Sequence, residues 1–204
     1  MFETEWQQPV AASSVMHINY GQITNKREEV AFKNILSFYN ISENLIVSIE
    51  YLKQIGGSSL TDANIKIDNT MNNIPNSYVP FRNANILSIA TVWAETINAN
   101  AIFIGASEVD NSGYPDCKRE FFDAFENTIQ LGTNTKTPIK IETPLINFTK
   151  EDIVRKGIEL NIPFELSWSC YYENDIACGV CPSCLLRLEG FQKAGINDPI
   201  KYKK

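Results

Sequence analysis

The feature that most constrains this chain of 204 residues is a group of cysteines near its C-terminal end. Four of the five cysteines follow the spacing C-x7-C-x2-C-x2-C, at Cys170, Cys178, Cys181 and Cys184. Each CxxC pair places two thiolates on the same side of a tight turn, and four sulfur ligands make the closed tetrahedral shell of a structural zinc site. The spacing therefore predicts a zinc site that leaves no coordination position open for chemistry.

An iron–sulfur cluster, disulfide bonds and unligated buried thiols are the alternatives to zinc. Disulfides are disfavoured because nothing marks the chain as secreted: its start, MFETEWQQPV, has neither the basic nor the apolar region of a signal peptide. An iron–sulfur cluster remains an alternative, but adjacent CxxC turns without another ligand set favour zinc. Gly179 and Pro182 suit the turns, because glycine accepts a positive φ and proline restricts its own.

Composition and charge indicate a globular protein without a membrane or nucleic-acid partner. Hydrophobic residues make up 44% of the chain, and no window approaches the roughly 18 apolar residues of a membrane span. The net charge of −6 argues against a polyanion as partner. With no signal peptide at the start, we expect a cytoplasmic protein.

Apolar runs alternate with amphipathic segments, which predicts an α/β fold with a parallel sheet. Strands are expected at residues 15–19, 45–49, 101–104 and 139–141, and helices at 26–39, 83–98, 119–131, 150–160 and 183–194. The first helix is expected to have an apolar face formed by Val30, Ile35 and Phe38 with their neighbours Ala31 and Phe32, and Thr149 is a predicted N-cap. Residues 54–78 are polar and rich in Gly and Asn, typical of a functional lid or a disordered loop.

Polar residues lie where predicted strands end or helices start, the edge at which an open α/β sheet binds its ligand. Tyr20 and Gln22 follow the first strand, where an ordinary strand-to-helix turn is the alternative to a binding role. Arg82 and Asn83 start a helix, whose backbone N–H groups favour an anion. A guanidinium suits a planar carboxylate or phosphate, and an ion pair with a surface carboxylate is the alternative.

The loop after the third strand, EVDNSGYPDCKR, carries two further acids, Asp110 and Asp116. These carboxylates could bind ring nitrogens or amines, or hold Mg²⁺, and turn-forming aspartates are the alternative. Cys117 in the same loop fits a small buried residue unless its pKa is depressed. Trp168 and Tyr171 flank the first metal cysteine, where packing against the metal loop is favoured over stacking on a heteroaromatic substrate.

Read together, these segments resemble the 7-cyano-7-deazaguanine synthase family of the queuosine and deazaguanine pathway. The matching stretches cover nearly all of the chain from Asn19 to Phe191. They are NYGQ (19–22), IGGSSLTD (55–62), SYVPFRNANILSIA (77–90), GASEVDNSGYPDCKREFFDAF (105–125), TPLINFTKEDIVRKG (143–157) and the C-terminal WSCY…CGVCPSCLLR…GF.

The resemblance implies a nucleotide α-hydrolase fold of the PP-loop ATPase type, with a doubly wound parallel sheet. Residues 1–148 would form the α/β nucleotide- and substrate-binding portion, and 149–204 a helical portion with the four-cysteine zinc site. Such enzymes are ATP-dependent ligases that convert 7-carboxy-7-deazaguanine and ammonia to 7-cyano-7-deazaguanine. They are usually homodimers, and they use Mg²⁺ with ATP and hold structural Zn²⁺.

The resemblance also implies roles for individual residues. Arg82 and Asp116 would act in catalysis, and the four cysteines would hold zinc. Residues expected to bind the substrate or nucleotide are Tyr20, Gln22, Arg82, Asn83, Asp110, Tyr114 and Asp116.

One departure from the family concerns the phosphate loop SGGxDS, which follows the first strand there and is not found in this sequence. NYGQ normally belongs to the second strand. A doubly wound sheet without its central first strand would expose two rows of unpaired backbone groups or force a repaired pairing. We therefore expect Met1 to be an internal methionine of a longer reading frame, and a polypeptide of this length to bind ATP poorly. A non-catalytic, zinc-stabilised deazapurine-binding or regulatory protein is the alternative.

Overall fold

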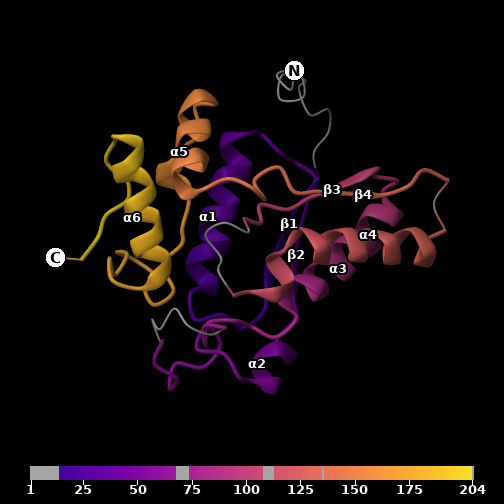
Figure 1. The fold of residues 1–204 in the computed structure, drawn as a ribbon, viewed down its shortest axis with the longest axis horizontal. Coiled ribbons are helices and arrows are strands. Elements are labelled where there is room, and N and C mark those ends of the chain that lie inside the picture. The colour runs from indigo at the N-terminus through magenta and orange to yellow at the C-terminus, as the bar shows by residue number, and fades with distance from the viewer. Residues whose placement is uncertain (1–13, 68–73, 108–112, 135, 204) are drawn as a thin grey trace.

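The protein has an α/β fold, as the sequence predicts. The computed structural model describes residues 14–67, 74–107, 113–134 and 136–203 (Figure 1). In chain order the elements are β1 (Val15–Asn19), α1 (Asn25–Phe38), β2 (Asn44–Ser48), α2 (Tyr51–Ile55), α3 (Arg82–Thr96), β3 (Ala101–Phe103), the 3₁₀ helix η1 (Pro115–Cys117), α4 (Arg119–Gly132), β4 (Lys140–Glu142), α5 (Lys150–Glu159), the 3₁₀ helix η2 (Phe164–Leu166) and α6 (Pro182–Ala194). No helix in these described parts is both long and apolar enough to cross a membrane.

The strands form two parallel pairs. β1 pairs with β2, with Val15 opposite Asn44, and β3 pairs with β4, with Ala101 opposite Lys140. Within the described ranges the two pairs are separate sheets, so the parallel α/β class is confirmed while the continuous sheet is divided in two.

β1 is paired on one edge only in the described part of the chain. The Val15 N–H donates to the Glu43 carbonyl (3.1 Å), and the Ile49 N–H donates to the Asn19 carbonyl (2.7 Å). A parallel strand bonds each neighbour through alternate residues, so Val15 and Asn19 face β2 and the backbone groups of Ile18 point to the opposite edge. Within the described residues no other strand meets that edge.

Helix α3 joins two apolar clusters. Its Leu87 and Ala94 lie in a cluster formed mainly with α4, β4 and the segment after it, and its Ile86 and Ile89 pack against a second cluster around β1 and α2. The fully buried members of the first cluster include Phe122. Arg82, at the start of this helix, is therefore carried by an element that is anchored on two sides.

Helix α1 turns only part of the predicted apolar face to the interior. Val30 and Phe38 are 50% and 52% exposed, whereas Ala31 and Leu36 are buried. Apolar residues surround this helix, so composition alone does not select the inward stripe. Packing against the sheet selects the Ala31–Leu36 stripe.

The polar stretch 54–78 is packed where the structure describes it. Ser58 and Leu60 are buried, the Ser59 N–H donates to the Asn76 carbonyl (2.9 Å), and the Ile23 N–H donates to the Leu60 carbonyl (3.0 Å). These contacts make the described part of the stretch a fixed cover over the β1 cluster. Residues 68–73 lie outside the description.

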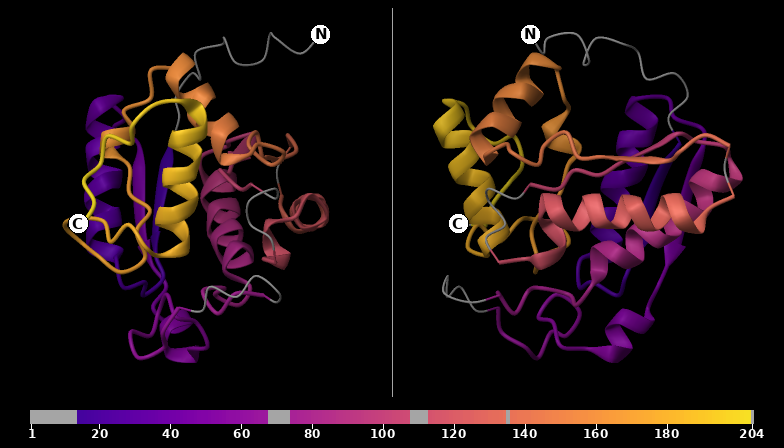
Figure 2. Two further views of the ribbon diagram at one scale, coloured as in Figure 1. Left: turned by 60° about the vertical axis from the view of Figure 1, so that its left-hand side comes forward. Right: turned by 45° about the vertical axis from the view of Figure 1, so that its right-hand side comes forward.

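The C-terminal part contains helices α5 and α6, which lie side by side at one end of the molecule (Figure 2). Thr149 caps α5 as predicted: its hydroxyl accepts from the Asp152 N–H (3.2 Å), and Asp152 accepts from the Thr149 N–H (3.0 Å). Arg187 of α6 makes a bidentate, largely buried ion pair with Asp198 (2.6 and 2.9 Å). This pair fixes the final segment against α6. The division of the chain into an α/β portion (1–148) and a helical portion (149–204) stays a prediction.

Candidate functional site

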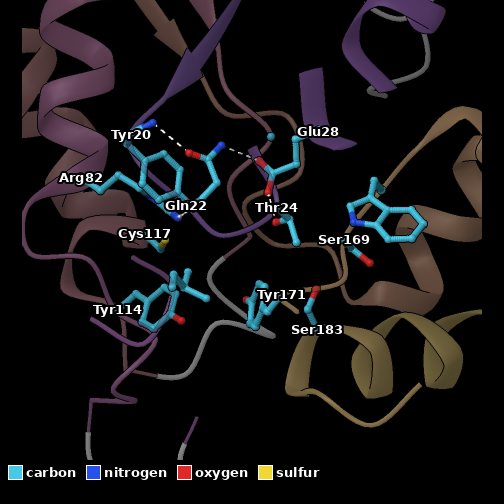
Figure 3. A pocket seen from close by; sticks show the side chains of 13 residues that line it. Tyr20, Gln22, Thr24, Glu28, Arg82, Tyr114, Cys117, Ser169, Tyr171 and Ser183 are labelled. Atoms are coloured by element: carbon cyan, nitrogen blue, oxygen red, sulfur yellow. Dashed lines mark hydrogen bonds between the residues drawn. The ribbon is translucent and has the colours of Figure 1, made fainter. Parts of the chain in front are cut away.

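A cavity of about 460 Å³ opens beyond the carboxyl ends of β1 and β3 (Figure 3). Tyr20 follows β1, Gly105 follows β3, and Arg82 starts α3, so the strand ends and the helix start meet there as predicted. The described lining residues are Tyr20, Gln22, Thr24, Glu28, Leu60, Arg82, Gly105, Tyr114, Cys117, Trp168, Ser169, Tyr171 and Ser183.

Arg82 supplies a positive charge to the cavity. Its Nη1 donates to the Tyr20 hydroxyl (3.1 Å), and its guanidinium lies 5.2 Å from the centre of the Tyr20 ring. Burial by itself would lower the pKa of Arg82, but the Tyr20 phenol raises it overall, so the guanidinium stays charged. Burial also raises the pKa of Tyr20, which keeps the phenol neutral. Among the described residues no carboxylate forms an ion pair with Arg82, so this charge is available to an anionic ligand.

A second charged group, Glu28, was not foreseen from the sequence. Its carboxylate accepts from the Gln22 amide (2.9 Å) and from the Thr24 hydroxyl (2.6 Å). The Gln22 carbonyl oxygen in turn accepts the Tyr20 N–H (2.9 Å), which fixes the orientation of the amide. These bonds hold the Glu28 carboxylate in one place. The signal that could have found it is its position in the first turn of the helix that follows NYGQ.

Asn83 and Asp116 bind each other and are not among the described lining residues. The Asn83 N–H donates to an Asp116 carboxylate oxygen (2.9 Å), and the Asn83 amide donates to the Asp116 carbonyl (2.8 Å) and to the Cys117 sulfur (3.3 Å). Both residues are buried. This geometry makes Asp116 a support for the helix start that carries Arg82, and the direct contacts predicted for both residues stay predictions.

The loop around η1 contributes Tyr114 and Cys117 to the cavity wall. The Tyr114 hydroxyl lies 2.7 Å from the Ser77 hydroxyl, so its ring is fixed. Burial raises the pKa of the Cys117 thiol, which fits the small buried residue and not a thiolate nucleophile. Asp110 lies outside the described residues.

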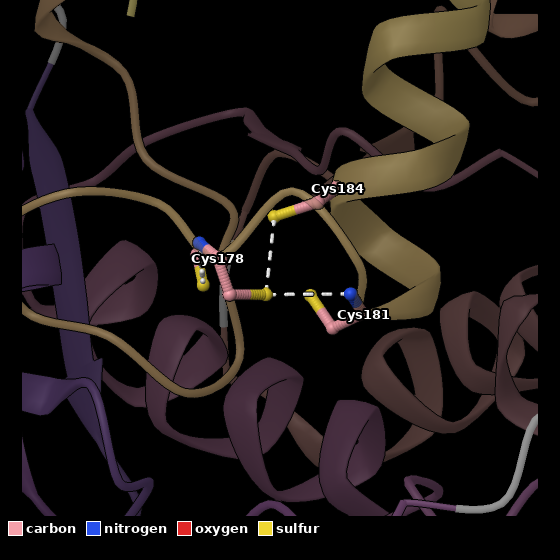
Figure 4. Close-up of side chains that lie close together, drawn as sticks. Cys178, Cys181 and Cys184 are labelled. Atoms are coloured by element: carbon pink, nitrogen blue, oxygen red, sulfur yellow. Dashed lines mark hydrogen bonds between the residues drawn. The ribbon is translucent and has the colours of Figure 1, made fainter. Parts of the chain in front are cut away.

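The four predicted metal ligands converge, and Figure 4 labels three of them, Cys178, Cys181 and Cys184. The sulfur atoms of Cys170, Cys178, Cys181 and Cys184 all lie within 4.8 Å of one another, and the Cys178–Cys184 distance is 3.9 Å. Zinc–sulfur bonds of about 2.3 Å in a tetrahedron give sulfur–sulfur edges of about 3.8 Å. All five cysteines are free thiols, so none is used in a disulfide. The donor set fits a closed metal site.

Backbone geometry supports that fit. The Cys181 N–H donates to the Cys178 sulfur (3.3 Å), and the Cys178 N–H donates to the Cys170 sulfur (3.4 Å). Such donors favour the thiolate form that a metal requires. Gly179 has the predicted positive φ, +74°.

The cysteine loop, residues 167–184, also builds part of the cavity wall. Ser169 and Tyr171 flank the ligand Cys170, and Ser183 precedes the ligand Cys184. The Trp168 indole nitrogen and the Ser169 hydroxyl are buried and have no hydrogen-bond partner within the part of the chain that the structure describes. The metal ligands and one wall of the cavity therefore belong to the same short segment.

Comparisons with known proteins agree with the resemblance. A family model described as queuosine biosynthesis protein QueC matches residues 6–195. A 7-cyano-7-deazaguanine synthase of Chloroherpeton thalassium is 55% identical over 193 residues, which are 93% of this chain and 85% of that protein. The 7-cyano-7-deazaguanine synthase of Chlorobium phaeobacteroides is 56% identical over 194 residues (94% and 86%), and that of Chlorobaculum tepidum is 51% identical over 193 residues (93% and 85%). The chain therefore belongs to the queuosine biosynthesis protein QueC family.

Proposed function

We propose that the protein is an ATP-dependent ligase that converts 7-carboxy-7-deazaguanine and ammonia to 7-cyano-7-deazaguanine. The observation that carries the proposal is the Arg82 guanidinium, which lines the cavity without a carboxylate partner in the described residues. A substrate carboxylate is the group that this planar fork binds best. The names of the relatives favour the ligase over a non-catalytic deazapurine-binding protein.

The reaction needs ATP because a carboxylate oxygen is a poor leaving group. Transfer of a phosphoryl or adenylyl group to the carboxylate makes an activated acyl species, and ammonia displaces that group to give the amide. A second activation, at the amide oxygen, allows that oxygen to leave as the nitrile forms. When ammonia adds to the activated acyl group, Arg82 would stabilise the negative charge that develops on the carbonyl oxygen.

The remaining predicted residues take supporting places around this centre. Tyr20, Gln22 and Tyr114 would bind the deazaguanine ring or the nucleotide, and Asp110 stays a predicted pocket residue. Asn83 and Asp116 would fix the start of α3 beneath Arg82. Cys170, Cys178, Cys181 and Cys184 would hold structural Zn²⁺, which supplies no chemistry and fixes the cysteine loop. Mg²⁺ would enter with ATP.

The cellular setting is part of the same proposal. We expect the protein to act in the cytoplasm as a homodimer, the state implied by the family resemblance. A net charge of −6 supports small-molecule substrates over direct binding of nucleic acid.

Replacing Arg82 by Ala tests the proposal. The affinity for 7-carboxy-7-deazaguanine, measured by calorimetry without ATP, should fall about 10- to 100-fold, because a hydrogen-bonded charge pair is lost. Arg82→Lys should recover only part of it, since an ammonium lacks the bidentate fork. Arg155→Ala removes an exposed arginine of α5 and should leave the affinity unchanged.

Turnover separates the two candidate functions. A ligase forms the nitrile from the acid, ATP, Mg²⁺ and ammonia, detected by mass spectrometry. Binding of the acid without any nitrile would favour the binding protein. Unchanged affinity and turnover in Arg82→Ala would remove the proposed role of this residue.

A further inference from the structure

Glu28 is the one carboxylate among the described residues that line the cavity, and nothing so far gives it a role. It forms no ion pair within the described part of the chain. One hydrogen bond to each oxygen leaves a free lone pair on each. A fixed carboxylate with two free lone pairs is complementary to a pair of adjacent N–H donors.

Trp168 packs beside the start of α1: the centre of its ring lies 4.3 Å from the guanidinium of Arg27, the residue before Glu28. The indole N–H of Trp168 can only donate a hydrogen bond, and it is buried without a partner among the described residues, as is the Ser169 hydroxyl. A buried polar group without a hydrogen-bond partner raises the free energy of the protein, so a ligand that places an acceptor against this part of the wall would bind favourably. In Figure 3, Arg82 and Ser169 lie on opposite sides of the cavity and Glu28 lies between them.

The wall therefore presents a fixed order of groups: donors at Trp168 and Ser169, then an acceptor at Glu28, then a cation at Arg82. The rim of a guanine-type ring with a carboxylate on carbon 7 has the complementary order. Its acceptor N3 is followed by the 2-amino and N1–H donors, then by the 6-oxo group, and finally by the carboxylate. The match assigns one ligand group to the Trp168 indole, two to the Glu28 carboxylate and one to Arg82.

We propose that Glu28 is the specificity-determining residue that accepts hydrogen bonds from the N1–H and 2-amino groups of a guanine-type ring, while the Trp168 indole N–H donates to N3. This inference rests on the proposed function, since it takes the substrate carboxylate to lie at Arg82. Gln22 and Thr24 are positioning residues that aim the Glu28 carboxylate.

Two ligands measure this role directly: 7-carboxy-7-deazaguanine and its analogue without the 2-amino group, a 7-carboxy-7-deazahypoxanthine. The unmodified full chain should bind the amino compound about 10- to 100-fold more tightly by calorimetry. In Glu28→Gln this preference should fall to near unity. Glu29→Gln changes a neighbouring acid that bonds Asn19 and Lys33 instead, and it should keep the full preference.

Trp168→Phe gives an independent reading. It keeps an aromatic ring but removes the donor, so both ligands should weaken by the same factor, about 3- to 10-fold, and the preference should stay. Equal binding of the two ligands by the unmodified chain would overturn the proposal without any variant. So would an undiminished preference in Glu28→Gln. If the unmodified chain binds neither ligand, the proposed function itself fails.

Discussion

Asp116 shows that the type of a residue and its place in a loop can predict its position in the fold but not the partner of its side chain. A carboxylate in a bent loop at the ligand edge of a sheet predicts a substrate contact, yet its oxygen accepts the N–H of Asn83, 33 positions away in the sequence. The loop and its edge position follow from local patterns, because Gly and Pro mark turns. The direction of the side chain depends on a long-range contact with α3, which no local pattern encodes.

Asp116→Ala should lower the free energy of unfolding by about 1–3 kcal/mol, because it leaves the buried Asn83 N–H without its acceptor. Urea unfolding followed by circular dichroism measures the change. Asp123→Ala, at an exposed position of α4, is the matched control and should stay within about 0.5 kcal/mol of the unmodified chain. Equal effects of the two substitutions would contradict the supporting role of Asp116.

Some of the cavity residues could be predicted from the sequence and one could not. Tyr20, Gln22, Arg82 and Tyr114 line the cavity as expected, because ends of parallel strands share one edge of a sheet. Their binding roles stay predictions. Glu28 was missed because a glutamate in the first turn of a helix is ordinary on dipole grounds alone.

At the scale of elements, the predicted strands and longer helices begin and end within two residues of the observed ones. Apolar runs, an N-cap and glycine turns are local signals, and they suffice for boundaries. Helix α2 and both 3₁₀ helices were not predicted, because elements of three to five residues carry too short a pattern. Val30 and Phe38, predicted on the inward face of α1, are exposed, because the choice of inward face depends on packing against the sheet.

The contact between α5 and α6 depends on a glycine. A Cβ built on Gly190 of α6 would lie 2.8 Å from the Lys150 Cβ and 3.0 Å from the Lys150 carbonyl carbon and oxygen. Gly190→Ala should therefore lower the free energy of unfolding by about 1–3 kcal/mol through overpacking, although alanine is the better helix former. Thermal or urea unfolding measures the effect.

Gly132, the last residue of α4, is the matched control. A Cβ there meets no atom within 4 Å, so Gly132→Ala should raise the free energy of unfolding by about 0.5–1 kcal/mol. The opposite signs of the two substitutions are the expected result. Stabilisation by Gly190→Ala would show that the helices separate easily, against the packing described.

For the whole molecule, the cavity lies where separate parts of the interior meet. Tyr20 and Leu60 belong to the β1 cluster, and Tyr171 packs against both this cluster and the cysteine cluster. Parallel pairing and the convergence of the cysteines followed from sequence, the first from strand–helix alternation and the second from spacing. The contact between the cysteine loop and the cavity appeared in the sequence only as the less favoured role of Trp168 and Tyr171, because it joins segments about 150 residues apart.

Removing the metal should therefore weaken ligand binding in the cavity. We expect about one zinc per chain by elemental analysis of protein purified without chelator. Stripping it should free four further thiols to a thiol reagent and weaken binding of 7-carboxy-7-deazaguanine by about tenfold or more, because residues beside Cys170 and Cys184 form the wall. Restoring Zn²⁺ should restore the affinity. Full affinity in the metal-free protein would contradict the claim that the metal, by fixing the cysteine loop, shapes the binding cavity.

Helix α3 has a further consequence for any anion that enters the cavity. A free arginine carries about 2 kcal/mol of rotamer entropy, and a ligand that must first immobilise it loses that much affinity. Here the first residue of a helix anchored on two sides is already oriented by a tyrosine hydroxyl. The Arg82 guanidinium is thus already immobilised before the ligand binds, so binding an anion costs little additional side-chain entropy.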